Sequence, residues 1–180
     1  MGVRDKVRPA VTSILGERGY RGLTYEGVAS RSGVAKTTLY RHWPTRAEMV
    51  FDLVVHDREL PALDNDLSCA GVCQALARRI VDFMAGAPGE SMMSALLVDM
   101  AADPQLGERL RKGPVMAGCA EMTRLLDRAG LAPAPGLSVS DLQMTLLGAT
   151  QAWLTVLALP PDVVEERVEA LAVSLLREAS

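Results

Sequence analysis

Apolar residues recur at helical spacing along most of the chain, so the pattern predicts an almost entirely helical protein. A first helix is predicted from about Asp5, and Pro9 is expected within about its first turn, where the missing backbone N–H does little harm. A second helix is capped by Thr24 and ends at Gly33. A short third helix follows over about 35–42. The N-terminal part is therefore predicted to be a three-helix unit.

The same spacing continues through the rest of the chain and predicts further helices with short breaks between them. Thr45-x-x-Glu48 is a capping-box pattern, in which each side chain bonds to the backbone amide of the other residue, so a fourth helix starts there. The predicted helices cover about 45–58, 69–84, 92–100, 106–130 with a break or kink at 113–114, 138–159 and 162–178. The fold class is therefore all-α, with about nine helices.

The net charge of −3 is unevenly distributed along the chain. Residues 1–50 carry nine Lys and Arg against four Asp and Glu, which is +5, whereas 51–180 carry ten against eighteen, which is −8. A basic N-terminal part on an acidic body is typical of a small module that faces nucleic-acid phosphates. Charge alone fits an ordinary fluctuation of surface charge equally well.

Cysteine content and the N-terminal sequence indicate a cytoplasmic protein. Three cysteines do not make a disulfide framework, and the first residues have mixed charges and no apolar signal-like stretch. Residues 142–159 form an uncharged run of 18 residues, but several Gln and Thr side chains interrupt it and Pro160-Pro161 follows at once. We interpret this run as a helix packed against protein rather than a membrane span.

Residues 24–49 combine two short helices with a glycine turn. Val28, Val34 and Leu39 are expected to pack the helices at their crossing, and Gly33 lets the backbone reverse between them. The polar face of the second helix is then available to enter a major groove. Its donors to phosphates or base edges are Lys36, Thr37, Thr38, Tyr40, Arg41 and His42.

This segment resembles the helix-turn-helix of the TetR family of transcriptional regulators. The run from Gly33 carries the resemblance: a small residue and Val, then Lys, a polar pair, Leu-Tyr, two further residues, an aromatic residue and a capped helix. Ala35 departs from the usual capping Ser or Thr, at a cost of roughly 0.5 to 2 kcal/mol in helix stability. Trp43 replaces the usual Phe or Tyr, and Arg46 replaces the usual Lys.

The resemblance implies a homodimer with a helix-turn-helix DNA-binding domain over 1–47 and a helical ligand-binding and dimerisation domain over 48–180. It implies backbone contacts from Thr24, Tyr25, Tyr40, His42 and Arg46, and groove contacts from Lys36, Thr37 and Thr38. The implied partners are double-stranded DNA with a palindromic operator and a small-molecule effector. The function it implies is that of a repressor released from its operator by a small, largely apolar ligand.

Two features of the C-terminal part fit these implied roles. Methionines are concentrated between 84 and 144, and flexible thioethers suit an apolar pocket, although ordinary core filling is the alternative for each one. The predicted pocket residues are Met84, Met93, Met100, Met116 and Met122. Apolar stripes on the last two helices fit either a core or a dimer interface, and the family resemblance favours the interface. The predicted interface residues are Leu142, Leu146, Ala149, Trp153, Val168, Leu171 and Leu175.

Other functions have less support in the sequence. The chain has two His residues, no Gly-rich phosphate loop, no Gly-x-Ser-x-Gly and no paired-His motif, so an enzyme is not expected and no cofactor is predicted. A helical adaptor or ligand-binding protein without DNA binding is the alternative, and the presence of Lys36, Tyr40 and Arg46 speaks against it.

A metal site is the remaining alternative. Cys69 and Cys73 lie on one helical face and could be joined by Cys119 or His56. Their spacing does not match the usual zinc patterns, and they lie on an apolar stripe, so buried core thiols are the favoured interpretation and no metal is predicted.

Overall fold

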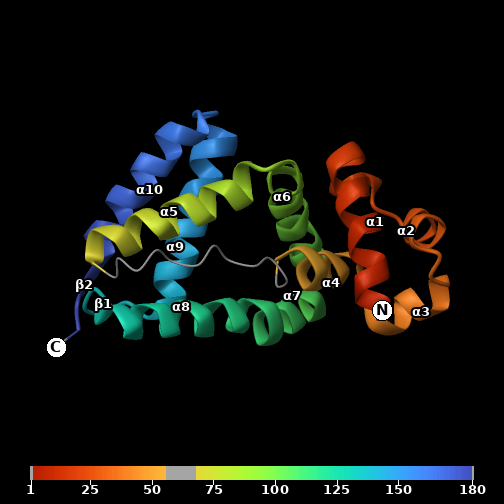
Figure 1. Cartoon of the computed structure of the whole chain (residues 1–180), viewed down its shortest axis with the longest axis horizontal. Helices are drawn as coiled ribbons and strands as arrows, with labels where there is room; N and C mark the ends of the chain where they lie inside the picture. Colours follow the sequence, from red (N-terminus) through yellow and green to blue (C-terminus); the bar gives the residue numbers. More distant parts are fainter. Residues whose placement is uncertain (1, 56–67, 180) are drawn as a thin grey trace. The chain divides into compact units, whose positions relative to one another are not determined.

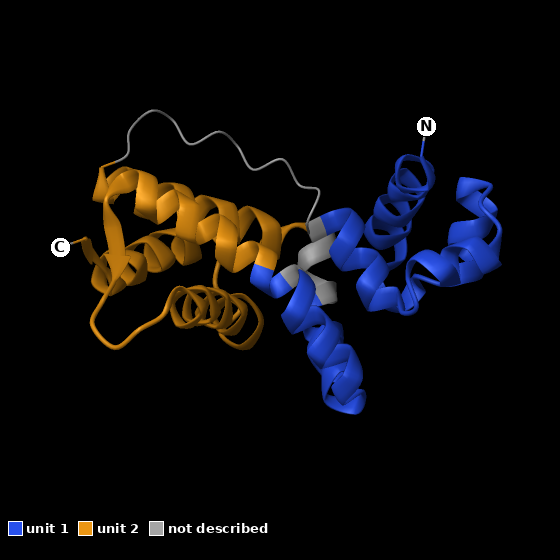
Figure 2. Cartoon of the chain, turned by 90° about the horizontal axis from the view of Figure 1, so that it is seen from below, with its two compact units in different colours: residues 1–59, 87–116 blue, residues 60–86, 117–180 orange. Residues whose placement is uncertain are grey.

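The computed structural model describes residues 2–55 and 68–179. Their contacts divide the chain into two units (Figure 2). Unit 1 comprises residues 1–59 and 87–116, and unit 2 comprises residues 60–86 and 117–180. This division follows contacts, whereas the predicted boundary after residue 47 concerns function and stays a prediction. Within the described ranges no helix combines the length and apolar character needed to span a bilayer.

Unit 1 contains the N-terminal helices together with two helices from the middle of the chain (Figure 1). Its elements are α1 (Val3–Arg18), the 3₁₀ turn η1 (Tyr20–Gly22), α2 (Tyr25–Ser32), α3 (Lys36–His42), α4 (Arg46–Val50), the π-helical turn η2 (Phe51–Val55), α6 (Ala87–Ala102), α7 (Pro104–Leu110) and the π-helical turn η3 (Arg111–Val115). The break predicted at 113–114 is thus a π-helical turn. The end of the predicted fourth helix, at about 58, and the loop around 61–66 lie outside the described residues.

The predicted apolar face of the first helix is confirmed. Val7, Val11, Ile14 and Leu15 of α1 are at most 2% exposed. The expectation for Pro9 is wrong: α1 begins at Val3, so the proline lies well inside the helix. The helix accommodates it on its exposed side, where water can satisfy the carbonyl that loses its N–H partner.

Unit 2 is a helical assembly around one apolar core. Its elements are α5 (Cys69–Ala85), α8 (Met116–Ala129) apart from its first residue, β1 (Leu131–Pro133), α9 (Val139–Gln151), the π-helical turn η4 (Ala152–Val156), α10 (Pro161–Leu175) and β2 (Leu176–Glu178). Helices α5 and α10 lie side by side (Figure 1), and α9 packs against both. Their shared core is closed by Leu125 and Leu126 of α8.

The all-helical expectation holds except at one point of unit 2. The last helix was expected to reach about 178, but it ends at Leu175, and β2 pairs antiparallel with β1. Gly130 has a φ of 64° and ends α8, which brings the following strand beside the C-terminal segment. Because Leu175 and Leu176 are adjacent apolar residues, their pattern does not distinguish a helix from a strand.

Candidate nucleic-acid interface

Helices α2 and α3 form the predicted helix-turn-helix. Thr24 caps α2, and its Oγ1 accepts a hydrogen bond of 3.0 Å from the Gly27 amide. Gly33 has a φ of 68°, a left-handed conformation that glycine adopts without strain, and it ends α2. Ala35, which has no side-chain acceptor, occupies the N-cap of α3, so the expected weak cap is confirmed.

Aromatic side chains hold α3 against α2. The rings of Tyr25 and Tyr40 stack with centroids 3.9 Å apart. The Tyr25 hydroxyl donates a 2.6 Å hydrogen bond to the carbonyl oxygen of Trp43, and burial raises the pKa of Tyr25 to about 12. Trp43 is buried in turn, and its indole N–H donates to Asp52 Oδ2 at 2.8 Å. The indole N–H of Trp43 is thus satisfied by Asp52, whereas the usual Phe has no donor that needs a partner.

The rest of α3 presents a polar face. Leu39 is fully buried, and Tyr40 is 48% exposed. Thr38 is half-buried, and the exposed polar residues are Lys36, Thr37, Arg41 and His42. The helix therefore buries one side against the unit and offers hydroxyls and cations on the other, as the sequence predicted.

An ion pair between Glu26 and Lys36 lies at the start of this polar face. The Lys36 ammonium donates to Oε1 of Glu26, which lies in the first turn of α2, and both side chains are largely exposed. The pair lowers the pKa of Glu26 and raises that of Lys36, because each charge stabilises the other. The sequence analysis missed this contact. The sequence nevertheless contains a signal for it, because residues 24–46 carry four basic side chains and a single acidic one, Glu26.

Arg46, predicted as a phosphate contact, already uses part of its guanidinium for contacts inside unit 1. Its Nη1 donates a 3.2 Å hydrogen bond to the Leu23 carbonyl oxygen, and the guanidinium lies 5.3 Å from the centroid of the Tyr20 ring. A guanidinium carries further N–H donors beyond the one used here. The side chain is half-buried at the first turn of α4.

The predicted capping box at the start of α4 is present and is tied to α7. Thr45 Oγ1 accepts from the Glu48 amide at 3.1 Å, and Glu48 Oε2 accepts from the Thr45 amide at 2.9 Å. The other carboxylate oxygen of Glu48 accepts from Arg109 Nε at 2.6 Å. A second tie joins Tyr20, whose hydroxyl donates to Asp99 of α6 at 2.7 Å. Within unit 1, α6 is thus bonded to η1 and α7 to α4.

Comparisons with known proteins agree with this geometry. Residues 11–53 match the family model of bacterial regulatory proteins of the tetR family. The crystal structure of the TetR family transcription regulator SCO0332 shares 28% identity, with a TM-score of 0.73 over 94% of this chain and 96% of that one. Over its whole length the chain is therefore similar to a TetR-family transcription regulator, and residues 11–53 match the model of that family.

Two further solved structures share the fold of this chain. A transcriptional regulator from Rhodococcus sp. Rha1 is 19% identical, with a TM-score of 0.63 over 95% of this chain and 94% of that one. A TetR-family regulator from Mesorhizobium loti is 19% identical, with a TM-score of 0.58 over 96% and 93%. No curated protein matches the sequence significantly. The family consists of transcription regulators rather than enzymes, and its members bind DNA.

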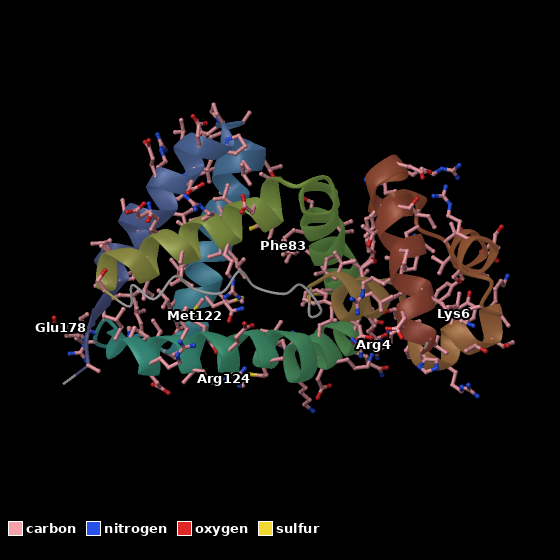
Figure 3. The ribbon with its side chains drawn as sticks, viewed as in Figure 1. Arg4, Lys6, Phe83, Met122, Arg124 and Glu178 are labelled. Carbon is pink, nitrogen blue, oxygen red and sulfur yellow. The ribbon has the colours of Figure 1, made fainter. Side chains whose placement is uncertain are left out.

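The methionines predicted to line the regulator's pocket are divided between the units. Met84 and Met122 belong to unit 2, where Met84 is buried and Met122 packs against the core from the side of α8 opposite to Arg124 (Figure 3). The other three belong to unit 1, where Met93 and Met100 are half-buried on α6 and Met116 is 54% exposed. A shared pocket for the five stays a prediction.

Three of the predicted dimer-interface residues are corrected by the structure. Leu142, Leu146 and Val168 are fully buried inside the protomer, where they contribute to the core of unit 2, so they are not available to a partner. The reason is that α5 lies against α9 and α10 and covers the apolar stripes that the sequence had left without a partner. The remaining four, Ala149, Trp153, Leu171 and Leu175, are half-buried.

Cys73 and Cys119 are buried, as predicted for core thiols, whereas Cys69 is half-buried. Cys73 is fully buried, and burial raises the pKa of its thiol to about 12. All three cysteines carry free thiols. Within residues 2–55 and 68–179 no group of three or more metal-ligating side chains is found, and His56 lies outside that part of the chain.

Proposed function

We propose that the protein is a homodimeric TetR-type repressor that binds a palindromic operator in the cytoplasm and leaves it when a small, largely apolar ligand binds. The observation that carries the DNA-binding part is α3: a helix with one buried side and one cationic, hydroxyl-rich side, held on α2 by the Tyr25–Tyr40 stack. Such a rigid mounting suits a helix that enters a major groove.

The roles of individual residues follow from their exposure. Lys36 and Thr37, at the exposed N-terminal end of α3, are proposed to read base edges together with Thr38. Arg41, His42 and Tyr40 are exposed nearer its C-terminal end and are proposed to contact phosphates and sugars. Tyr25 contributes by positioning α3, since its hydroxyl is already bonded to a carbonyl oxygen. Thr24 and Arg46 are proposed as phosphate contacts beside it.

Dimerisation is proposed through the outward face of α9 and of the turn that follows it. Met144, Gly148 and Ala152 are exposed at a spacing of four residues, and Val156, at the next such position, is 77% exposed. Asp141 is the only charged residue from 139 to 157, so this face can be buried without removing many charges from water. Small residues at 148 and 152 allow the helices of two copies to approach closely.

The DNA-binding proposal is tested by titrating the protein against its own promoter region at two salt concentrations. Wild type is expected to bind a specific site and to lose roughly a thousandfold or more in affinity between about 50 and 200 mM salt, because a dimer contacts several phosphates. Arg41→Ala should weaken binding and reduce the salt dependence, whereas Arg124→Ala, the same charge change on α8, should not. If wild type binds no such DNA, the helical-adaptor alternative replaces this function.

The dimer proposal is tested by light scattering. Val156→Glu should yield monomers at micromolar concentration, because two unpaired carboxylates would be buried against each other. Val98→Glu on α6, where the original side chain is 67% exposed, is the matched control and should leave the dimer intact. A Val156→Glu protein that stays dimeric would place the interface elsewhere.

The ligand proposal is tested by NMR of ¹³C-methyl methionine. Titration with a panel of apolar small molecules should shift the Met84 and Met122 signals with those compounds that release DNA, since thioethers suit a pocket for apolar ligands. A compound that releases DNA while every methionine signal stays in place would contradict a methionine-lined pocket.

A further inference from the structure

The ion pair at the start of α3 has a consequence for sequence recognition, which rests on the DNA-binding function proposed above. Lys36 is the first residue of α3, and N-terminal residues of a recognition helix are the ones that reach base edges. Its partner Glu26 lies in the first turn of α2, ten residues earlier in the chain. A carboxylate therefore lies beside the lysine that is proposed to reach the bases.

A carboxylate at this place is unfavourable for general DNA binding. It lies in the first turn of α2 and pairs with Lys36, in a stretch where every other charge between Thr24 and Arg46 is positive. Phosphates and purine N7 and O6 atoms are acceptors, and a carboxylate offers them no donor. The major-groove amino donors are cytosine N4–H₂ and adenine N6–H₂, and cytosine is the usual partner of a Glu or Asp side chain because adenine also presents its N7 acceptor.

We propose that Glu26 is a specificity-determining residue: it holds Lys36 in the free protein and, on DNA, accepts a hydrogen bond from the amino group of a cytosine in each half-site. Guanine or thymine at that position faces the carboxylate with acceptors or a methyl group, and adenine sets its N7 acceptor beside its N6 donor, so each satisfies the carboxylate less well than cytosine does. Glu26 thus selects mainly by rejecting other bases. A merely structural role, in which the acid stabilises the N-terminus of α2, predicts no effect on base preference.

The matched control is Glu17 of α1. It pairs with Arg31 at 2.6 Å within the same unit, so Glu17→Gln changes the net charge by the same amount as Glu26→Gln. The two variants therefore share any long-range electrostatic effect on DNA, and they differ in whether the lost carboxylate lies beside the first residue of α3.

The experiment selects binding sites from a library of random-sequence duplexes with wild type, Glu26→Gln and Glu17→Gln, and then measures affinities for the wild-type site and for its single-base-pair variants. Wild type should prefer cytosine at one position of each half-site. Glu26→Gln should lose about fivefold or more of the discrimination there and should gain affinity for unselected DNA, because one mismatched pair typically changes affinity by at least that factor. Glu17→Gln should keep the wild-type preferences.

Three outcomes would overturn the proposal. Equal preferences in all three proteins would leave Glu26 without a role in specificity. A gain of affinity in Glu26→Gln with unchanged discrimination would reduce its effect to charge. A wild-type protein that selects specific sites with no cytosine preference would exclude the proposed contact while leaving the DNA-binding function intact. Failure of wild type to select any site would refute that function itself.

Discussion

Both units bury apolar side chains, but they differ in the polar bonds that join their elements. In unit 1 many of the bonds between elements are polar: Tyr20 with Asp99, Glu48 with Arg109, and Arg4 with Asp52. Unit 2 is built around a continuous apolar core from α5, α8, α9 and α10. Polar bonds are directional and can be exchanged for others of similar energy, whereas an apolar core can only be opened at the expense of burial. Unit 1 also buries apolar side chains such as Leu15 and Leu39, so its polar bonds add direction to a core of its own.

The largest expected effect is in the core of unit 2. Leu146→Ala should lower the free energy of unfolding by about 2 to 5 kcal/mol, because the lost methyl groups leave a cavity among fully buried neighbours. Thr145→Ala, at the preceding, exposed position of α9, is the control and should change it by about 0.5 kcal/mol or less. Urea denaturation followed by circular dichroism measures both. Equal losses would mean that α9 is not oriented as described.

A smaller loss is expected at the polar junction of α2 and α3. Tyr25→Phe leaves the Trp43 carbonyl without its hydroxyl donor and should cost about 1 to 3 kcal/mol. Tyr40→Phe keeps the stacked ring at a half-exposed position and should have little effect on stability. The same denaturation assay compares them, and a Tyr40→Phe loss as large as that of Tyr25→Phe would show that the hydroxyl bond is not what fixes α3.

The tie between α4 and α7 should be weaker still. Arg109→Ala is expected to cost about 0.2 to 1 kcal/mol, because the arginine of the pair is partly exposed to water. Glu48→Ala removes the capping box as well and should cost about 0.5 to 2 kcal/mol. A double-mutant cycle isolates their coupling. Strictly additive losses would show that the ion pair contributes nothing, and Lys112→Ala is the control for removal of an exposed cation on η3.

The smallest effect is the pH dependence that comes from Glu17. Hydrogen bonds from Arg31 and Ser13 lower its pKa from 4.5 to about 2 in the folded protein. Since the folded pKa is the lower one, the unfolded state binds the proton more readily. The stabilisation is therefore complete above the unfolded value of 4.5 and is lost as the pH falls towards about 2. Glu17→Gln should flatten the stability profile in that window, and an unchanged profile would contradict the pairing.

The comparison of the units also shows what the sequence could predict. Local signals were reliable: Thr24 and Thr45 cap helices as expected, Gly33 makes the turn, and Leu39 is buried. Which distant elements pack against one another was not predictable. The stripes that contain Leu142 on α9 and Val168 on α10 have the same spacing whether they meet another copy or α5 of their own chain.

The site was predictable to a similar extent. The polar face of α3 could be read from its spacing, whereas the commitment of Tyr25 and Arg46 to internal carbonyls depends on atoms brought together from far along the chain. Glu26 could have been found from the sequence as a lone acid in a basic segment, but its partner Lys36 is known only from the fold. A short C-terminal strand was missed because a three-residue element has too few positions to show a period.

The most direct test of the account is base-resolution protection of a selected DNA site by wild type and by a Lys36→Ala, Arg41→Ala double variant. The account predicts two symmetric protected half-sites in successive major grooves, about one helical turn apart or modestly more, and loss of both with the variant while its fold is retained. Protection that is absent in wild type, that lacks two-fold symmetry, or that is unchanged in the variant would contradict the claim that α3 of a dimer reads DNA.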